Sequence, residues 1–161
     1  MPEPIVIKLE PEWFGQGYYV YLVNIKYLGK QFNYIGMTGD RKAITARSPF
    51  FRMSGHFNLR DDSKENQITR GLRKEVKTGL DFHKELAKMD IQYYAYKVRD
   101  FDTKKHPEKR VVAERIESWI IRKFQSDNRN LFNVNISNKP TAETEKEAMP
   151  IYLDMIERIR I

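Results

Sequence analysis

Residues 18–35 read YYVYLVNIKYLGKQFNYI and predict an antiparallel β-hairpin. The first ten of these residues are largely aromatic or β-branched, which favours a strand over residues 18–27. Gly29-Lys30 makes a turn, and the chain returns as a second strand over residues 31–35. A later aromatic run, IQYYAYKV at residues 91–98, predicts a third strand.

The rest of the chain predicts helices around this sheet. Ser48 is a suitable N-cap for a short helix, because Pro49 follows it in the first turn. The predicted helices cover residues 48–56, 64–78, 81–90, 108–124 and 142–161. This order of elements favours an α+β fold, a small three-stranded antiparallel sheet flanked by helices with an extra C-terminal helix.

The C-terminal helix, residues 142–161, has one apolar face. Pro150 either interrupts this helix or starts it. The apolar face consists of Ala148, Tyr152, Met155, Ile156 and Ile159. Such a face either docks on the core or forms the contact of a homodimer.

Composition narrows the class of partner. The 161 residues are enough for one domain, and 29 Lys plus Arg against 22 Asp plus Glu give a net charge of +7. This excess favours an anionic partner, nucleic acid before an acidic membrane surface. The lack of cysteine excludes disulfides, thiol catalysis and Cys-based zinc sites, and three histidines are too few for a His-rich metal site. The sequence shows no signal peptide and no membrane span, so we expect a cytoplasmic protein with no membrane partner.

The helix predicted at 64–78 has two contrasting sides. Its apolar stripe repeats every four residues at Ile68, Leu72 and Val76. The opposite side carries four cations: Arg70, Arg73, Lys74 and Lys77. A run of charges is usually a solvated helix face. Here Glu75 is the acid interleaved among the four cations, and this excess of positive charge favours a surface that faces nucleic-acid phosphates.

Glu117 lies in an apolar context on the helix predicted at 108–124. Its same-face neighbours are Ala113, Ile120 and Ile121. Position i−3 is Glu114, so no cation on the helix can pair with Glu117 at the usual spacing. A carboxylate at the edge of a core-facing stripe must find a partner on another element or shift its pKa. The alternatives are an ion pair with a distant arginine and a metal ligand, whereas Glu114 itself is expected to be a solvated charge.

Arg52, His56 and several tyrosines form the remaining candidate site. Arg52 and His56 are four residues apart, so they share one face of a helix. A guanidinium can bind a phosphate through two hydrogen bonds, and an imidazole can move a proton near neutral pH. Tyr19 and Tyr21 point to one face of the first strand, and Tyr34 lies on the second. Aromatic core packing is the alternative role for each tyrosine.

Together these residues resemble the GIY-YIG nuclease superfamily. Gly17-Tyr18-Tyr19 departs from Gly-Ile-Tyr only at its middle position, and Tyr34-Ile35-Gly36 matches the second motif. Fourteen residues separate Tyr19 from Tyr34, which makes the hairpin longer than is usual in the family. Arg52 and His56 match the family's arginine and the histidine or tyrosine one helical turn later.

The resemblance continues to the end of the predicted domain. The segment ESWIIRKF, which begins at Glu117, resembles the helix with the catalytic glutamate. Asn133 resembles the asparagine that closes the domain. The nuclease-like domain then covers residues 15–137, after an N-terminal extension at 1–14 and before the C-terminal helix at 138–161. Within the domain, residues 57–110 form an enlarged insert region.

The family resemblance implies a metal-dependent endonuclease that hydrolyses phosphodiester bonds of DNA. Its cofactor would be one Mg²⁺ or Mn²⁺ per active site, held by Glu117 as the only protein ligand. Tyr19 would be the general base for the attacking water. Tyr34 would contact the nucleophile or the scissile phosphate, and Arg52 would neutralise charge on the phosphoryl oxygens.

Two further residues have supporting roles in this scheme. His56 would support Tyr19 or take part in proton transfer. Asn133 would make an architectural hydrogen bond that orients the Glu117 helix. The resemblance favours DNA over RNA, although the residues themselves do not decide between them.

Two alternatives compete with this assignment. Asp62 with Glu75-Val76-Lys77 is similar to the acid-x-Lys pattern of restriction-type sites, but that site needs a strand where a helix is predicted. A non-catalytic nucleic-acid-binding module of the same fold would show the same charge and the same basic helix. The presence of all the proposed catalytic residues favours the enzyme.

Overall fold

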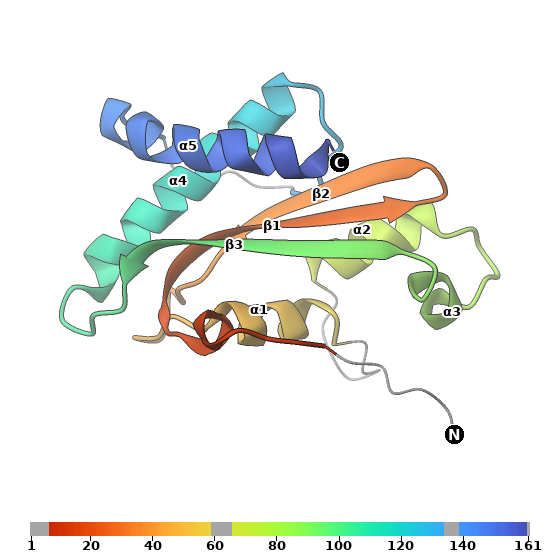
Figure 1. Ribbon diagram of the computed structural model, residues 1–161, viewed down its shortest axis with the longest axis horizontal. Coiled ribbons are helices and arrows are strands. Elements are labelled where there is room, and N and C mark those ends of the chain that lie inside the picture. Colours follow the sequence, from red (N-terminus) through yellow and green to blue (C-terminus); the bar gives the residue numbers. More distant parts are fainter. Residues whose placement is uncertain (1–6, 59–65, 134–138, 161) are drawn as a thin grey trace.

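A computed structural model describes residues 7–58, 66–133 and 139–160 of the chain. Its centre is an antiparallel sheet in the strand order β2-β1-β3 (Figure 1). The strands are β1 (Gly17–Tyr27), β2 (Lys30–Met37) and β3 (Asp90–Asp100). The predicted α+β fold with three antiparallel strands is confirmed, and each strand extends beyond its predicted range.

The β1–β2 hairpin has a two-residue turn at Leu28 and Gly29. Both residues have positive φ angles, 48° and 76°, as in the type I′ turn that matches the twist of a hairpin. Tyr27 pairs with Lys30, so Lys30 belongs to β2. The turn therefore lies one residue earlier than predicted.

The helices agree with the predicted order and differ in length. They are α1 (Pro49–His56), α2 (Gln67–Glu75), α3 (Phe82–Leu86), α4 (His106–Ser126) and α5 (Ala142–Ile159), and a 3-10 turn, η1 (Pro11–Phe14), precedes β1. The predicted N-cap of α1 is confirmed, because the Ser48 side chain accepts a hydrogen bond from the backbone N–H of Phe51. Helix α2 is shorter than predicted, because Asn66 caps its start and Val76 is already extended.

Helices cover both faces of the sheet. Helices α4 and α5 lie on one side, and α1, α2 and α3 lie on the other (Figure 1). Alternate residues of β1 supply the two cores: Val20 and Leu22 face α4, whereas Val23 and Ile25 face α2. A strand that is buried on both faces needs apolar residues at nearly every position, which explains the composition of residues 18–27.

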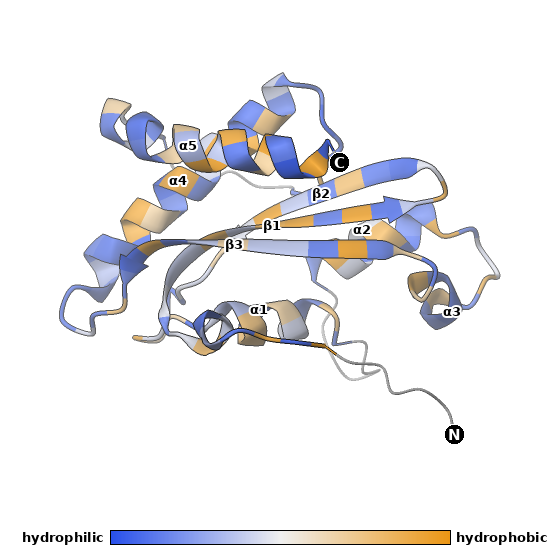
Figure 2. Ribbon diagram, in the orientation of Figure 1, coloured by the Kyte–Doolittle hydropathy of each residue, from blue (hydrophilic) through white to orange (hydrophobic). Residues whose placement is uncertain are grey.

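Helix α5 docks on the core of its own chain. The five residues of its predicted apolar face are all buried, in one cluster with residues of α4. Figure 2 shows hydrophobic and hydrophilic residues alternating along α5, as expected for a helix with one buried side. Pro150 lies inside the helix rather than at an end. The docking alternative is thus confirmed, and a homodimer would have to use another side of α5.

Residues 130–133 lie along the outer edge of β2. The backbone N–H of Asn33 donates to the carbonyl of Asn130 at 2.9 Å, and that of Phe132 donates to the carbonyl of Asn33 at 2.9 Å. Asn33 and Leu131 form a parallel bridge. The segment therefore covers an edge that would otherwise expose unpaired backbone groups.

Within the described part of the chain, no helix is both long enough and apolar enough to cross a bilayer.

Candidate active site

Strand β1 and helix α1 bring together Tyr21, Arg52 and His56. The Tyr21 hydroxyl lies 2.7 Å from His56 Nε2. Arg52 Nε donates a hydrogen bond of 3.1 Å to the same hydroxyl. Because Arg52 and His56 are one turn apart on α1, both reach the same oxygen. One phenol oxygen is thus held between an imidazole and a guanidinium.

Two more tyrosines surround the Tyr21 ring. Tyr34 of β2 has its ring centre 6.2 Å from that of Tyr21 and meets the His56 ring edge-on at 5.2 Å. Tyr93 of β3 stacks on Tyr21, with ring centres 5.0 Å apart and an interplanar angle of 19°. The buried Tyr93 hydroxyl has no hydrogen-bond partner among the described residues. A buried hydroxyl without a partner is costly, so Tyr93 is suited to meet a substrate oxygen or a water.

Burial sets the protonation states in this cluster. Burial, together with the nearby charge of Arg52, lowers the pKa of His56 to about 4, so the imidazole is neutral at pH 7. Burial also raises the pKa of Tyr21 well above its usual value, with Tyr34 adding to the effect and Arg52 opposing it. The hydrogen bond therefore joins a neutral phenol to a neutral imidazole, which can accept the phenol's proton.

Glu117 lies on α4 at the side of this cluster. Its side chain is half-buried, and no hydrogen bond or ion pair to it occurs among the described residues. Loss of solvent, and then the charge of Glu114, raise the pKa of Glu117 to about 8, against the effect of Arg52. Burial, and then the charge of Glu117, raise the pKa of Tyr34. The carboxyl group of Glu117 is therefore coupled electrostatically to the group formed by Tyr21, Tyr34, Tyr93, Arg52 and His56, called the tyrosine cluster below.

Glu114 corrects one expectation from the sequence. It is buried rather than solvated, and it forms ion pairs with Arg41 and, at 3.0 Å, with Arg110. The sequence shows Arg110 at the i−4 position but does not show that the loop after β2 returns Arg41 to α4. Among the described residues Glu117 is thereby left without an ion-pair partner, although Arg41 and, on its own helix, Arg110 lie near enough to act on its pKa.

The donor set at Glu117 fits a hydrated divalent cation. The described residues contain no group of three or more His, Cys, Asp or Glu side chains that could hold a metal ion. Mg²⁺ does not need such a group, because it keeps several waters and binds through one or two carboxylates plus substrate phosphate. A carboxyl group without a partner and with a raised pKa is one whose ionised form a cation would favour.

Tyr19 lies outside the cluster, although it is on the same face of β1 as Tyr21. Its ring lines a separate pocket of about 140 Å³ with Trp13 and Pro49, and its backbone N–H donates to Thr38 Oγ1 at 2.9 Å. Its described contacts do not include Tyr34, Arg52 or His56. The structure thus brings Tyr21, rather than Tyr19, into contact with Arg52 and His56.

Hairpin length is the signal that could have identified Tyr21. Only twelve residues separate Tyr21 from Tyr34, two fewer than separate Tyr19 from Tyr34. Both tyrosines share one face of the strand, so strand periodicity could not choose between them. No sequence pattern predicts that Tyr93 lies beside Tyr21, because this contact follows from the pairing of β3 with β1.

Asn133 fastens the segment after α4 to β2. Its Oδ1 atom accepts a hydrogen bond of 2.9 Å from the backbone N–H of Ile35, and its Nδ2 atom donates one of 2.6 Å to the carbonyl of Ile35. Ile35 lies between Tyr34 and Gly36 in the second motif. Asn133 therefore fixes backbone geometry at β2, and that it orients the Glu117 helix stays a prediction.

The four predicted phosphate-binding cations lie on or after α2. All of them, Arg70, Arg73, Lys74 and Lys77, are exposed. Lys77 follows the end of the helix, and the Arg73 guanidinium lies 4.3 Å from the centre of the Phe82 ring. In the competing acid-x-Lys site, Asp62 lies outside the described residues, and Glu75 is the last residue of α2 rather than part of a strand.

Comparisons of the chain with protein-family models, with curated proteins and with solved structures found no significant match.

Proposed function

We propose that the protein is a metal-dependent endonuclease of the GIY-YIG type, which hydrolyses phosphodiester bonds of DNA. One observation carries the proposal: a buried tyrosine oxygen, that of Tyr21, is held by His56 Nε2 at 2.7 Å and by Arg52 Nε at 3.1 Å. Two chemically active groups on a single phenol exceed what core packing requires. The carboxyl group of Glu117 on α4, which has no hydrogen-bond or ion-pair partner among the described residues and is coupled electrostatically to Tyr34 and Arg52, completes the set of groups.

The proton pathway follows from the protonation states. Burial disfavours an isolated phenolate at Tyr21, so the phenol passes its own proton to His56 Nε2 as it accepts one from the attacking water. Tyr21 remains neutral, and the new positive charge lies on His56. The anionic phosphate favours that charge. Tyr21 thus takes the general-base role that the resemblance assigned to Tyr19.

Arg52, Tyr34 and Glu117 act on the phosphate. The guanidinium of Arg52 stays charged, because the neighbouring tyrosine oxygens raise its pKa, and it offsets charge that develops on the phosphoryl oxygens. Tyr34 positions the nucleophile or the scissile phosphate. Glu117 would hold one Mg²⁺ or Mn²⁺, which supplies Lewis-acid stabilisation at the phosphate when bound.

A plasmid assay tests the proposal. Purified protein is incubated with supercoiled plasmid and Mg²⁺, or with EDTA, beside Glu117→Gln and the control Glu157→Gln, which makes the same change on the exposed side of α5. We expect metal-dependent nicking or linearisation by the wild type and the control and none by Glu117→Gln. Salt-sensitive binding without cleavage in all three proteins would instead support a non-catalytic nucleic-acid-binding module. Cleavage that survives Glu117→Gln would mean that the active site lies elsewhere.

A further inference from the structure

A pocket of about 300 Å³ lies between α2 and residues 130–133. Its volume is at the lower end of the range for pockets that hold small ligands. Among its lining residues are Phe32, Gln67, Arg70, Lys74, Asn130 and Phe132. None of these residues takes part in the tyrosine cluster, so the pocket is a separate feature that needs its own explanation.

One wall of the pocket is aromatic. Phe32 and Phe132 stack with their ring centres 5.2 Å apart and an interplanar angle of 12°. Phe32 is buried, whereas Phe132 keeps part of its surface exposed. Phe132 also packs so closely on α2 that a Cβ atom at Gly71 would overlap its ring. The pocket thus offers a rigid, flat apolar surface beside open space.

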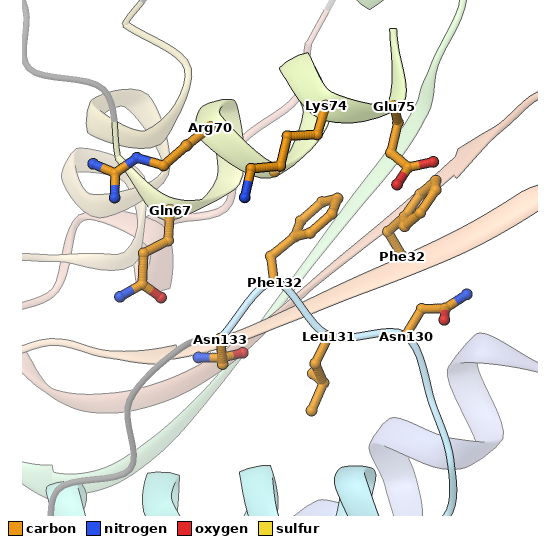
Figure 3. Close-up of a pocket in the computed structure, with 10 residues that line it drawn as sticks. Phe32, Gln67, Arg70, Lys74, Glu75, Asn130, Leu131, Phe132 and Asn133 are labelled. Carbon is orange, nitrogen blue, oxygen red and sulfur yellow. The ribbon is translucent and has the colours of Figure 1, made fainter.

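The opposite wall is polar and positively charged. Gln67, Arg70 and Lys74 follow one side of α2 at helical spacing. Figure 3 shows the Lys74 amine and the Gln67 amide directed toward the space beside Phe132. The acid in this wall, Glu75, is paired with Lys30 at 3.0 Å, so its charge is already compensated.

The pocket is connected to the tyrosine cluster through β2. Phe32 and Tyr34 are two residues apart, so they lie on the same face of the strand, about 7 Å apart along it. Asn133, which lines the pocket, also holds the backbone of Ile35. A nucleic-acid strand with a phosphate at the cluster can therefore place a neighbouring nucleotide in the pocket.

We propose that this pocket binds one nucleotide of the substrate strand with its base unpaired. The base packs against Phe132, and the phosphate lies at Lys74 and Arg70. Aromatic packing against a base and cationic contact with its phosphate are the two contacts by which proteins hold single-stranded nucleic acid. The inference rests on the proposed function in taking nucleic acid as the ligand. It adds that the substrate class has an unpaired nucleotide beside the cleavage site, as a tail, flap or branch does and a continuous duplex does not.

Binding without cleavage tests the pocket. Fluorescence anisotropy in EDTA compares two labelled DNA probes, a blunt hairpin duplex and the same hairpin with a single-stranded tail. We expect Phe132→Leu to weaken binding of the tailed probe by about fivefold or more and to leave the blunt probe unchanged. Lys74→Ala should weaken binding of the tailed probe and reduce its salt dependence by about one phosphate contact, whereas Lys146→Ala, the same change on α5, should not.

Each outcome decides the proposal. Unchanged binding of the tailed probe by Phe132→Leu, with thermal unfolding like that of the wild type, would overturn it, and so would an equal loss for both probes. Since Lys74 is exposed, its variant reports on the pocket even if Phe132→Leu unfolds. Free deoxynucleoside monophosphate serves as a competitor: displacement of the tail at low concentration would make the pocket a site for free nucleotides and overturn its assignment to the substrate strand.

The two proposals fail separately. A preference for the tailed probe that depends on Phe132, with no metal-dependent cleavage of any probe, would retain the pocket and remove the nuclease. Cleavage that requires Glu117, with no preference for the tailed probe, would retain the nuclease and remove the nucleotide pocket.

Discussion

Gly36 lies directly opposite Tyr21 in the β1–β2 ladder, and a Cβ atom at position 36 would overlap the Tyr21 hydroxyl. The side chain of Tyr21 crosses the neighbouring strand at the one position where that strand has no side chain. The glycine of the Tyr-Ile-Gly motif is therefore what allows the phenol to reach His56 and Arg52.

Gly36→Ala should displace Tyr21 and lower both stability and activity. Overpacking at a buried site costs about 1–3 kcal/mol of the free energy of unfolding, and chemical denaturation measures it. Gly55→Ala is the matched control, because a Cβ built at this position in α1 has no described atom within 4 Å apart from those of its chain neighbours and of the helix backbone. The control should be neutral or up to about 1 kcal/mol more stable, since alanine favours helix. Equal stability of the two variants would contradict the close approach of Gly36 and Tyr21.

Two Tyr→Phe variants separate the roles of the two tyrosines on one face of β1. Tyr21→Phe removes the oxygen between His56 and Arg52, so we expect the cleavage rate to fall about 100-fold or more. Tyr19→Phe should cleave at close to the wild-type rate, because its hydroxyl lies beside Gly15, outside the cluster. Single-turnover cleavage measures both, and the reverse order of effects would restore the general-base role to Tyr19.

Tyr93→Phe makes a distinct prediction. Its hydroxyl is buried without a partner, so its removal should not lower stability and should raise it slightly. A slower cleavage rate in a variant that is at least as stable as the wild type would show that this hydroxyl meets the substrate or a water there. An unchanged rate would leave Tyr93 with the role of stacking on Tyr21.

The raised pKa of Glu117 predicts how stability depends on pH in EDTA. The folded protein keeps the proton of Glu117 up to about pH 8, whereas an unfolded glutamate loses it near pH 4.5. Between these values the folded state binds more protons, so this group makes stability fall as pH rises. Glu117→Gln should therefore be more stable than the wild type at pH 8, and the difference should shrink toward pH 5. Thermal unfolding across this range measures it.

Glu114→Gln is the control for that experiment, and its stability should change in the opposite direction. Glu114 is buried and paired with the largely exposed Arg41 and with the mostly buried Arg110, so loss of its charge leaves the Arg110 guanidinium without this partner in a poorly solvated site. We expect about 3 kcal/mol lower stability at pH 8. A gain in stability from both variants would mean that the two carboxyl groups have been assigned to the wrong environments.

The sequence predicts the sheet better than the site, and the reason is physical. Strand periodicity and β-branched residues identified all three strands, because these signals are local. The choice between Tyr19 and Tyr21 depends on hairpin register, which is set by the positive φ angles of Leu28 and Gly29 and by the position of Gly36. The one-residue shift of the turn changes no side-chain face but changes which residues oppose each other.

Glu114 and Glu117 illustrate the same limit on α4. The sequence shows that no cation on the helix is spaced to pair with Glu117, and this holds in the structure. It also places Arg110 at the i−4 position of Glu114, but the second ion-pair partner of Glu114, Arg41, comes from a loop that is distant in the sequence. Spacing along a helix shows whether a residue has an ion-pair partner on the same helix. It does not show a partner from another element, because that contact depends on how the elements pack.

His56 predicts a second pH dependence, on the acid side. The folded state keeps this imidazole neutral down to about pH 4, whereas an unfolded histidine binds a proton near pH 6.5. Between these values the unfolded state binds more protons, so stability is lost as pH falls from 6.5 toward 4. The loss attributable to His56 is roughly 3 kcal/mol over this range. His56→Gln, which keeps a hydrogen-bonding group near Tyr21 but does not titrate, should reduce the slope, whereas His83→Gln on the exposed side of α3 should leave it unchanged. Equal slopes in the wild type and His56→Gln would show that folding does not lower the pKa of His56, and would contradict a buried imidazole that stays neutral across this pH range.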